Sequence, residues 1–447
     1  MSIFKVYDIR GVFGRDFTAE TAYRIGRCLP GLLQAKRVLI GRDARLSSPA
    51  LRDALCRGLT EAGADVDDMG LATTPMVYCF TARDGYDASL QITASHNPPE
   101  YNGLKISAAG ARPVGLDTGL AELERRVAGE LPVPAARPGA LRVVSRQQEF
   151  VEFLRPWMPD LSGLKFAVDC SDGMAGLIAR DLFGPNTLLL NDTPDGAFPH
   201  HGSNPLEAAN REQLVKVVRA QKLDVGVIFD GDADRVMFVD ETGEFIQPDY
   251  LIPVLAKRFL RDTPGGIVLC DIRTSRGTTE ALTAAGARPM LWKVGHAFAK
   301  VKMRETGAVC GGELAGHYYF RDFFNCDSGE LAALVILDEL AAARARGVTF
   351  SQLLAPIRKY ASTGEVNFTV ARKAEAMQAI REALLAEAKP QALLDFDGIR
   401  IEYADWWINV RSSNTEPYLR LVLEADSPAR LAERRAVVER VLAPFVG

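Results

Sequence analysis

The stretch VGVIFDGDADR, residues 225–235, decides the fold. Its first five residues predict a buried β-strand, and its polar residues begin where that strand ends. Ligands of open α/β sheets bind outside the carboxyl ends of the strands, so this edge is the first place to look for a site. The aspartates Asp230, Asp232 and Asp234 repel one another unless a cation neutralises them, and a hard divalent ion, best Mg²⁺, is the natural occupant. A solvated acidic turn is the alternative.

On both sides of this stretch, strands alternate with helices, which predicts α/β domains. Strands are expected at 38–40, around 66, and at 88–93, 166–169 and 267–269, and helices at 18–29, 48–63, 174–182, 206–221, 276–285, 298–305 and 328–346. The breaker pair Pro30-Gly31 is expected to end the first helix. Beyond residue 363 the order changes to α+β, with strands at 366–370, 399–403 and 418–423 and helices at 374–387 and from 428.

The proline-rich segment 131–139 is typical of a linker between two such units. The fold class is therefore α/β, with three similar mixed α/β domains and a smaller C-terminal α+β domain. The expected domains are residues 1–140, 147–249, 250–360 and 364–447.

The composition, with 47% apolar and 25% charged residues, is that of an ordinary folded protein. Fifty-three Lys+Arg against 57 Asp+Glu give a net charge of -4 without a basic stripe, which argues against a nucleic-acid or membrane-surface binder. The seven cysteines are scattered and never form Cys-x-x-Cys, which predicts reduced, buried thiols. Without a secretory signal or an apolar run near the roughly 20 residues that span a bilayer, a cytoplasmic protein is expected.

A second polar cluster, TASHNP at 93–98, follows the expected strand at 88–93. It places the hydroxyl of Ser95 beside an imidazole on a loop fixed by proline, and Lys105 supplies a cation ten residues on. A serine in this position is a candidate nucleophile or phosphate carrier. An ordinary loop with a helix-capping serine is the alternative.

Two further clusters are weaker when taken alone. The glycine-rich loop 311–317 offers the acceptor and donor groups that a sugar hydroxyl needs, with a solvent-facing turn as the alternative. The segment 411–417 combines an arginine, hydroxyls and an amide, which suit a phosphate dianion, with a polar hairpin turn as the alternative. The candidate residues are Glu313, His317, Arg411, Ser413, Asn414 and Thr415. Together, the four clusters describe phosphoryl transfer to and from a sugar.

With these clusters in this order, the sequence resembles the α-D-phosphohexomutase family, and it is most similar to the bacterial phosphomannomutase/phosphoglucomutase branch. The resemblance spans nearly the whole chain. It is carried by YDIRG at 7–11, TASHNP at 93–98, DGDADR at 230–235, GELAGH at 312–317 and RSSNTEP at 411–417. It implies four domains around a central active-site cleft.

The resemblance also implies a site in which Ser95 carries a phosphoryl group and one Mg²⁺ is held by the aspartates and a phosphoserine oxygen. The ion and nearby cations would offset the charge of phosphoserine, about -1.5 to -2. The implied metal ligands are Ser95, Asp230, Asp232 and Asp234. The implied catalytic residues are Ser95, Lys105, Arg10, His317 and Arg235. The implied substrate-binding residues are Tyr7, Glu313, Arg411, Ser413, Asn414, Thr415, Lys293 and His296.

The implied reaction is the reversible interconversion of hexose 1-phosphate and hexose 6-phosphate, of mannose and/or glucose. It passes through phosphoserine and a bound hexose 1,6-bisphosphate, which is also the activator. Lys105 or His317 would be the general acid or base, with Lys105 ranked first, although a lysine base needs a lowered pKa. Arg42 and Arg45, with Lys293 and His296, are second-tier candidates for the site as a whole, with surface cations on loops as the alternative. The partner is a small phosphosugar, and both a monomer and a homodimer stay open.

Three positions depart from the family pattern: Ala315 stands where serine is usual, Arg273 where lysine is frequent, and Val294 where threonine is common. These changes affect specificity more than reaction type. Leu314 favours the mannose/glucose branch over phosphoglucosamine mutase, the first alternative, in which glutamine is usual. A magnesium-dependent phosphatase or kinase and an inactive sugar-phosphate binder are the others, and the sequence has no Walker-type loop to support the kinase.

Overall fold

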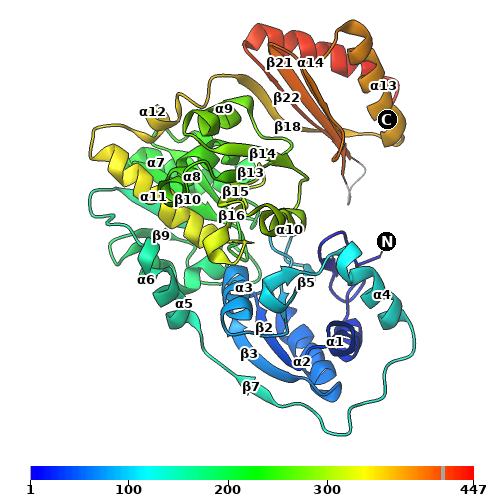
Figure 1. Ribbon diagram of the computed structural model, residues 1–447. Helices are drawn as coiled ribbons and strands as arrows, with labels where there is room; N and C mark the ends of the chain where they lie inside the picture. The colour runs from blue at the N-terminus through cyan, green and yellow to red at the C-terminus, as the bar shows by residue number, and fades with distance from the viewer. Residues whose placement is uncertain (1, 414–417, 447) are drawn as a thin grey trace.

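The strands of the chain form four sheets (Figure 1). The computed structural model describes residues 2–413 and 418–446. The four sheets follow one another along the chain, and helices pack on each of them. The described chain therefore has the three mixed α/β units and the final α+β unit that the sequence predicts.

The first sheet has the strand order β1-β5-β4-β2-β3-β7, with β6 on β5. Strands β2, β3 and β4 are parallel, and β1 and β5 run antiparallel to their neighbours. Its strands are β1 (Ile9–Val12), β2 (Arg37–Arg42), β3 (Asp65–Leu71), β4 (Ala88–Ile92), β5 (Tyr101–Ala108), β6 (Arg112–Pro113) and β7 (Leu141–Val143). Its helices are α1 (Ala19–Leu33), α2 (Ser48–Glu61), α3 (Thr74–Arg83) and α4 (Leu120–Ala128).

The pair Pro30-Gly31 does not end the first helix, so that prediction was wrong. Helix α1 continues to Leu33 and ends at Gln34, whose left-handed φ of 53° lets its N–H donate to the carbonyl of Pro30. A proline inside a helix costs about 3 kcal/mol. The apolar face of α1, which includes the fully buried Ile25, packs against α2 and outweighs that cost.

The second sheet has the order β12-β11-β10-β8-β9, and β10 is the strand predicted from residues 225–229. The predicted helix at 174–182 is split into a 3₁₀ turn, Met174–Leu177, and the short α6. The strands are β8 (Phe166–Asp169), β9 (Leu188–Leu190), β10 (Val225–Phe229), β11 (Val236–Asp240) and β12 (Phe245–Ile246). The helices are α5 (Gln147–Leu154), α6 (Ala179–Phe183) and α7 (Ala208–Gln221).

The third sheet has the order β14-β13-β15-β16-β17, with β13, β14 and β15 parallel. Its strands are β13 (Ile267–Asp271), β14 (Arg288–Trp292), β15 (Cys310–Gly312), β16 (Tyr318–Phe320) and β17 (Cys326–Asp327). Its helices are α8 (Ile252–Asp262), α9 (Arg276–Ala284), α10 (His296–Thr306), α11 (Gly329–Arg344) and α12 (Phe350–Leu354). Helix α11 buries most of its apolar residues between the second and third sheets.

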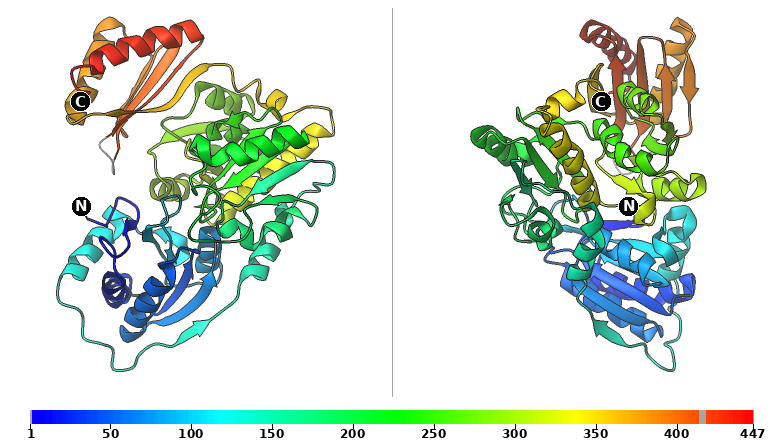
Figure 2. Two further views of the ribbon diagram at one scale, coloured as in Figure 1. Left: turned by 180° about the vertical axis from the view of Figure 1, so that it is seen from behind. Right: turned by 60° about the vertical axis from the view of Figure 1, so that its left-hand side comes forward.

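The fourth sheet is antiparallel, with the order β18-β22-β21-β20-β19, and two helices cover one of its faces (Figure 2). The strands are β18 (Ala361–Thr369), β19 (Ala392–Leu394), β20 (Ile399–Glu402), β21 (Trp406–Ser412) and β22 (Tyr418–Ala425), and the helices are α13 (Lys373–Glu387) and α14 (Pro428–Leu442). Strand β21 was not predicted. This unit has an apolar core of its own, whereas one continuous core joins the second and third units and reaches α3 of the first.

The fold also bears on the cysteines and on membrane-spanning helices. All seven cysteines are free and buried, as predicted. Among the described residues, none of the helices is both long and apolar enough to cross a bilayer. The domain limits at 140, 147, 249, 250, 360 and 364 stay a proposal, and β7 of the first sheet lies just beyond the first of them.

Candidate active site

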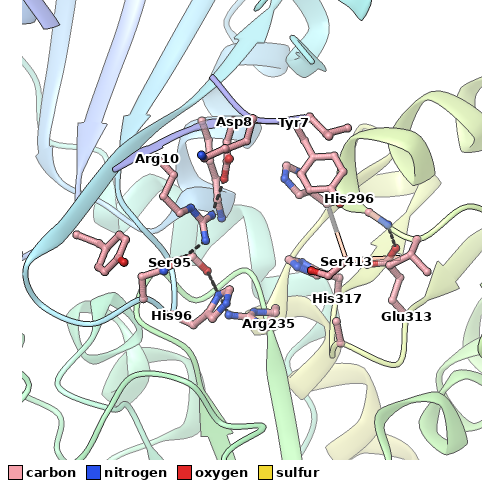
Figure 3. Close-up of a pocket in the computed structure, with 18 of the residues that line it drawn as sticks. Tyr7, Asp8, Arg10, Ser95, His96, Arg235, His296, Glu313, His317 and Ser413 are labelled. Carbon is pink, nitrogen blue, oxygen red and sulfur yellow. Dashed lines mark hydrogen bonds and ion pairs between the residues drawn. The ribbon is translucent and has the colours of Figure 1, made fainter. Parts of the chain in front are cut away.

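The loop after β4 holds Ser95 in a conformation that few side chains adopt. Its φ of 51° is left-handed, and its backbone N–H donates to Thr93 Oγ1 over 2.8 Å. The hydroxyl donates to Asp230 Oδ2 over 2.7 Å and lies 3.3 Å from Arg235 Nη2. His96 Nδ1 is 3.3 Å from the same hydroxyl (Figure 3). The first and second units therefore meet at the serine hydroxyl.

The acidic loop after β10 is fully buried, so a solvated acidic turn is excluded. Oxygens of Asp230, Asp232 and Asp234 all lie within 4.8 Å of one another. Lys105 Nζ donates to Asp232 Oδ2 over 2.6 Å and also to Asp234, and Arg235 Nε donates to Asp230 Oδ2 over 2.9 Å. One oxygen each of Asp232 and Asp234 has no hydrogen-bond partner in the described part of the chain. These spare carboxylate oxygens fit a hard divalent ion.

The buried charges raise the pKa of both Asp230 and Lys105. Burial and the neighbouring carboxylates raise the pKa of Asp230, against the lowering effect of Arg235. Burial lowers the pKa of Lys105, but the carboxylates of Asp232 and Asp234 outweigh it and raise that pKa above its ordinary value. The lowered pKa that a lysine base requires is therefore absent, and Lys105 is a cation held between two acids.

The turn between β15 and β16 brings Glu313 and His317 to the same space. Glu313 Oε1 accepts the backbone N–H of Gly295 over 2.6 Å. His317 Nδ1 lies 2.8 Å from Asp327 Oδ2 and 3.7 Å from Asp234 Oδ1. Burial lowers the pKa of His317, but these carboxylates outweigh it and raise that pKa. His317 can therefore hold a proton near neutral pH.

Residues at the start of α10 and at the start of the chain form the side of the site next to His317. The ring of Tyr7 meets the ring of His296 edge-on at 5.5 Å, and Figure 3 shows both beside His317. Burial lowers the pKa of His296 well below its ordinary value, so this imidazole is neutral. Lys293 does not line the cavity, and its ammonium lies 5.5 Å from the ring of Phe298.

The fourth unit contributes an arginine-rich corner. Arg411 lies at the end of β21, and its guanidinium is 3.8 Å from Glu365 on β18. Arg273 Nη1 donates to Glu365 Oε2 over 2.8 Å, and Arg420 Nη1 donates to Oε1 over 3.3 Å. Three guanidinium groups around one carboxylate leave an excess of positive charge that suits a phosphate dianion. The predicted Asn414 and Thr415 lie outside the described residues.

A cavity of about 700 Å³ joins these parts. Residues of all four units line this cavity. It therefore corresponds to the central cleft that the family resemblance implies. The predicted residues on its wall are Tyr7, Arg10, Ser95, Lys105, Arg235, His296, Glu313, His317, Arg411 and Ser413, and the three departing positions, Arg273, Val294 and Ala315, lie there too.

Four consecutive parts of the chain match four descriptions of one family. Residues 1–131, 148–243 and 247–360 match phosphoglucomutase/phosphomannomutase, alpha/beta/alpha domains I, II and III, and residues 365–441 match its C-terminal domain. The chain belongs to the phosphoglucomutase/phosphomannomutase family. This confirms the predicted family, fold class and enzyme class, an isomerase that acts by phosphotransfer on hexose phosphates. The family is magnesium-dependent, and the three aspartates form a possible site for the ion.

Whole-length relatives support the same membership. The phosphomannomutase of Salmonella montevideo is 38% identical over 448 residues and covers 97% of each chain. The phosphohexose mutases of Xanthomonas campestris pv. campestris strain B100 are 38% identical over 440 residues, again with 97% of each chain covered. A solved phosphoglucomutase/phosphomannomutase family protein from Burkholderia thailandensis is 32% identical, with a TM-score of 0.88 over 98% of this chain and 96% of that chain.

Sequence reasoning missed Glu365 of this phosphoglucomutase/phosphomannomutase site, and it ranked Arg42 and Arg45 second. Glu365 joins the arginines of the third and fourth units, although it precedes the predicted strand at 366–370 and carries no motif. Arg42 is half-buried and does not line the cavity. Arg45 is fully buried beneath the serine loop, so the alternative of a surface cation does not hold for it. The signal for Arg45 was its place two residues after the strand-ending GRD at 41–43.

Proposed function

We propose that this enzyme interconverts hexose 1-phosphate and hexose 6-phosphate, of mannose and/or glucose, with Ser95 as the phosphoryl carrier. The observation that supports this most directly is the 2.7 Å contact between the Ser95 hydroxyl and Asp230 at the wall of a cavity lined by all four units. A carrier hydroxyl beside a divalent-ion site is what phosphoryl transfer requires. The proposed location is the cytoplasm.

In the proposed reaction, the phosphoryl group on Ser95 passes to the free hydroxyl of a bound hexose 1-phosphate. The Ser95 O–P bond breaks, a bond from phosphorus to the sugar oxygen forms, and the product is a hexose 1,6-bisphosphate. The bisphosphate then turns over, so that the other phosphate returns to Ser95 and hexose 6-phosphate leaves. A bound Mg²⁺, held by Asp230, Asp232, Asp234 and a phosphoserine oxygen, would neutralise charge on the moving phosphoryl group.

The remaining residues would bind the sugar and its phosphate and would transfer the proton of the reacting sugar hydroxyl. Arg411 and Ser413, with Asn414 and Thr415, would bind the phosphate that is not transferred, and Glu313 would accept hydrogen bonds from sugar hydroxyls. His317 is the better candidate for the acid or base, because its Nδ1 is engaged by Asp327 and its Nε2 is left for the substrate. Lys105, Arg10 and Arg235 would offset the charge of phosphoserine.

The decisive experiment compares turnover of mannose, glucose and glucosamine 1-phosphates with a trace of glucose 1,6-bisphosphate. We expect turnover of the first two, and dominance of the amino sugar would make the enzyme a phosphoglucosamine mutase. Ser95→Ala should abolish turnover while the melting temperature is retained. Intact-mass analysis of the active protein should show one phosphoryl group, and substantial activity in the alanine variant would refute the carrier role.

A further inference from the structure

We propose that Arg45 is the positioning residue of the serine loop, residues 93–101. Its guanidinium group would hold the loop in the conformation that points the Ser95 hydroxyl at Asp230 and the cavity. The inference rests on the proposed role of Ser95 as phosphoryl carrier. Arg45 itself does not line the cavity, so it acts through the loop and not on the substrate.

Every N–H group of the Arg45 guanidinium has an acceptor. Nε donates to Asp43 Oδ2 over 3.0 Å. The two Nη groups donate to four backbone carbonyls of the serine loop, those of Ser95 (2.9 Å), Asn97 (2.7 Å), Pro98 (2.6 Å) and Tyr101 (3.0 Å). The side chain is 0% exposed. One cation therefore serves as the centre around which the loop is folded.

The serine loop needs such a centre because its backbone is unfavourable by itself. A serine with a φ of 51° is strained, and such strain persists only where the surroundings fix it. Four carbonyl oxygens that converge on one point also repel one another unless a donor lies between them. The Arg45 guanidinium meets both requirements with hydrogen bonds strengthened by its charge.

Arg45 is itself held from two sides. On its own unit, Asp43 Oδ1 accepts the Arg45 backbone N–H over 3.1 Å and the hydroxyl of Ser48 over 2.7 Å. From the second unit, the ring of Phe198 lies 5.1 Å from the guanidinium carbon, and Gly196 packs so closely on the Arg45 backbone that no Cβ would fit. The serine loop and the second unit, which carries the acidic loop, therefore share one support.

Lysine cannot replace this arginine, although it keeps the charge. An ammonium group has three donors in a compact head, whereas the guanidinium uses five donors in a planar fork. A displacement of about 1 Å at a reacting group can cost about 100-fold in rate. We therefore expect Arg45→Lys to misplace the Ser95 hydroxyl and to lower kcat, while the residues that bind the sugar and its phosphate keep KM close to its original value.

The test compares Arg45→Lys with Arg27→Lys in the full-length enzyme. Arg27 is a matched control, because it is 5% exposed in the same unit and its guanidinium donates to Tyr23 (2.8 Å) and to the carbonyl of Pro132, not to the serine loop. With glucose 1-phosphate, R45K should lower kcat about 10- to 100-fold and change KM less than about threefold. Single-turnover transfer from phosphorylated Ser95 should slow by the same factor, and R27K should keep the original kcat per folded molecule.

Each outcome decides between positioning and simple stabilisation. Equal kcat per folded molecule in R45K and R27K would overturn the proposal. If R45K does not fold, Asp43→Asn decides, because it keeps the guanidinium and weakens the contacts that orient Arg45. In D43N, a kcat lowered about threefold or more at constant KM supports positioning, and an unchanged kcat overturns it. An inactive wild-type protein without phosphate on Ser95 would instead refute the proposed function, and this inference with it.

Discussion

At residue 315 the cavity wall carries a methyl group where the family usually has a hydroxyl. Ala315 lies in the glycine-rich loop 311–317, two residues from Glu313, and both residues line the cavity. Ala315→Ser restores a hydrogen-bonding group, and one neutral hydrogen bond contributes about 1 kcal/mol, or about fivefold in affinity. We expect KM for the preferred hexose 1-phosphate to fall by about that factor, measured by steady-state kinetics on glucose and mannose 1-phosphates.

Ala315→Val is the control for this substitution. It adds volume without a hydrogen-bonding group, so KM should rise. If the serine variant and the wild type had equal KM on both sugars, residue 315 would not face the sugar, and its departure from the family pattern would carry no specificity.

The acidic loop leads to a prediction about metal removal. Asp230, Asp232 and Asp234 are fully buried, and Lys105 and Arg235 supply only two cations against them. Chelation should lower turnover on the order of 100-fold or more, and added Mg²⁺ should restore it. Asp234→Asn should raise the Mg²⁺ concentration needed for half-maximal activity. Full turnover in metal-free buffer, verified by elemental analysis, would contradict this role of the loop.

The role of a residue could be predicted where its side chain belongs to a recognisable polar motif. The role of a residue that binds backbone carbonyls could not be predicted from the sequence. Ser95 and the aspartates follow apolar strands, and their polarity at a strand end is visible in the sequence. Arg45 donates to four carbonyls, and a carbonyl has no sequence signature. The raised pKa of Lys105 was equally invisible, because it depends on aspartates about 130 residues away along the chain.

At the scale of elements, Asp249 joins two segments of the third unit. Its carboxylate accepts the backbone N–H of Ser275, the N-cap residue of α9, over 2.8 Å and the side chain of Gln247 over 2.7 Å. Burial raises the pKa of Asp249 to about 7. The folded protein therefore binds more protons than the unfolded chain, and the stability from this group falls as pH rises from about 4 to about 7.

Asp249→Asn should remove that dependence. Relative to the wild type, its melting temperature should rise as pH increases from about 4.5 to about 7.5, by an amount corresponding to roughly 3 kcal/mol. Differential scanning calorimetry at several pH values measures this. Asp53→Asn, at a carboxylate that is 70% exposed, is the control and should leave the slope unchanged. An identical pH slope in D249N and the wild type would show that Asp249 does not titrate in this range.

The elements themselves were predictable where the apolar period was long and unbroken. Strand β10 and helix α9 begin at their predicted residues. Helix α1 continues past Pro30, because its packing against α2 outweighs the cost of a proline inside the helix. Strand β21 was missed because its place in the sheet depends on pairing with β20 and β22, which lie on either side of it.

At the scale of the whole molecule, a buried arginine of the fourth unit helps to attach that unit to the third. Arg400 on β20 is 1% exposed, and its Nη1 donates to the carbonyls of Ile272 (2.7 Å) and Thr274 (2.8 Å) in the third unit. Its guanidinium also lies over the ring of Trp407 at 3.7 Å. The relative placement of the units depends on such contacts between distant parts of the chain, so the residue pattern could give four units but not this joint.

The joint determines where Arg411 and Ser413, the proposed phosphate-binding residues, lie relative to the glycine-rich loop 311–317. Arg400→Lys keeps the charge but loses the paired donation to two carbonyls, so the fourth unit should be placed less well. We expect KM for hexose 1-phosphates to rise about three- to tenfold, and phosphoserine to be hydrolysed faster because the cavity closes less completely. Initial rates and the release of inorganic phosphate measure the two effects.

Arg434→Lys is the matched control for this joint. Arg434 is also a buried arginine of the fourth unit and lies 5.3 Å from the ring of Trp406, but its ion-pair partners, Glu387 and Glu433, belong to that same unit. It should therefore lower stability without changing KM or phosphate release. If both lysine variants shifted KM equally, the effect would come from the stability of the fourth unit and not from its attachment, because Arg400, unlike Arg434, donates to carbonyls of the third unit.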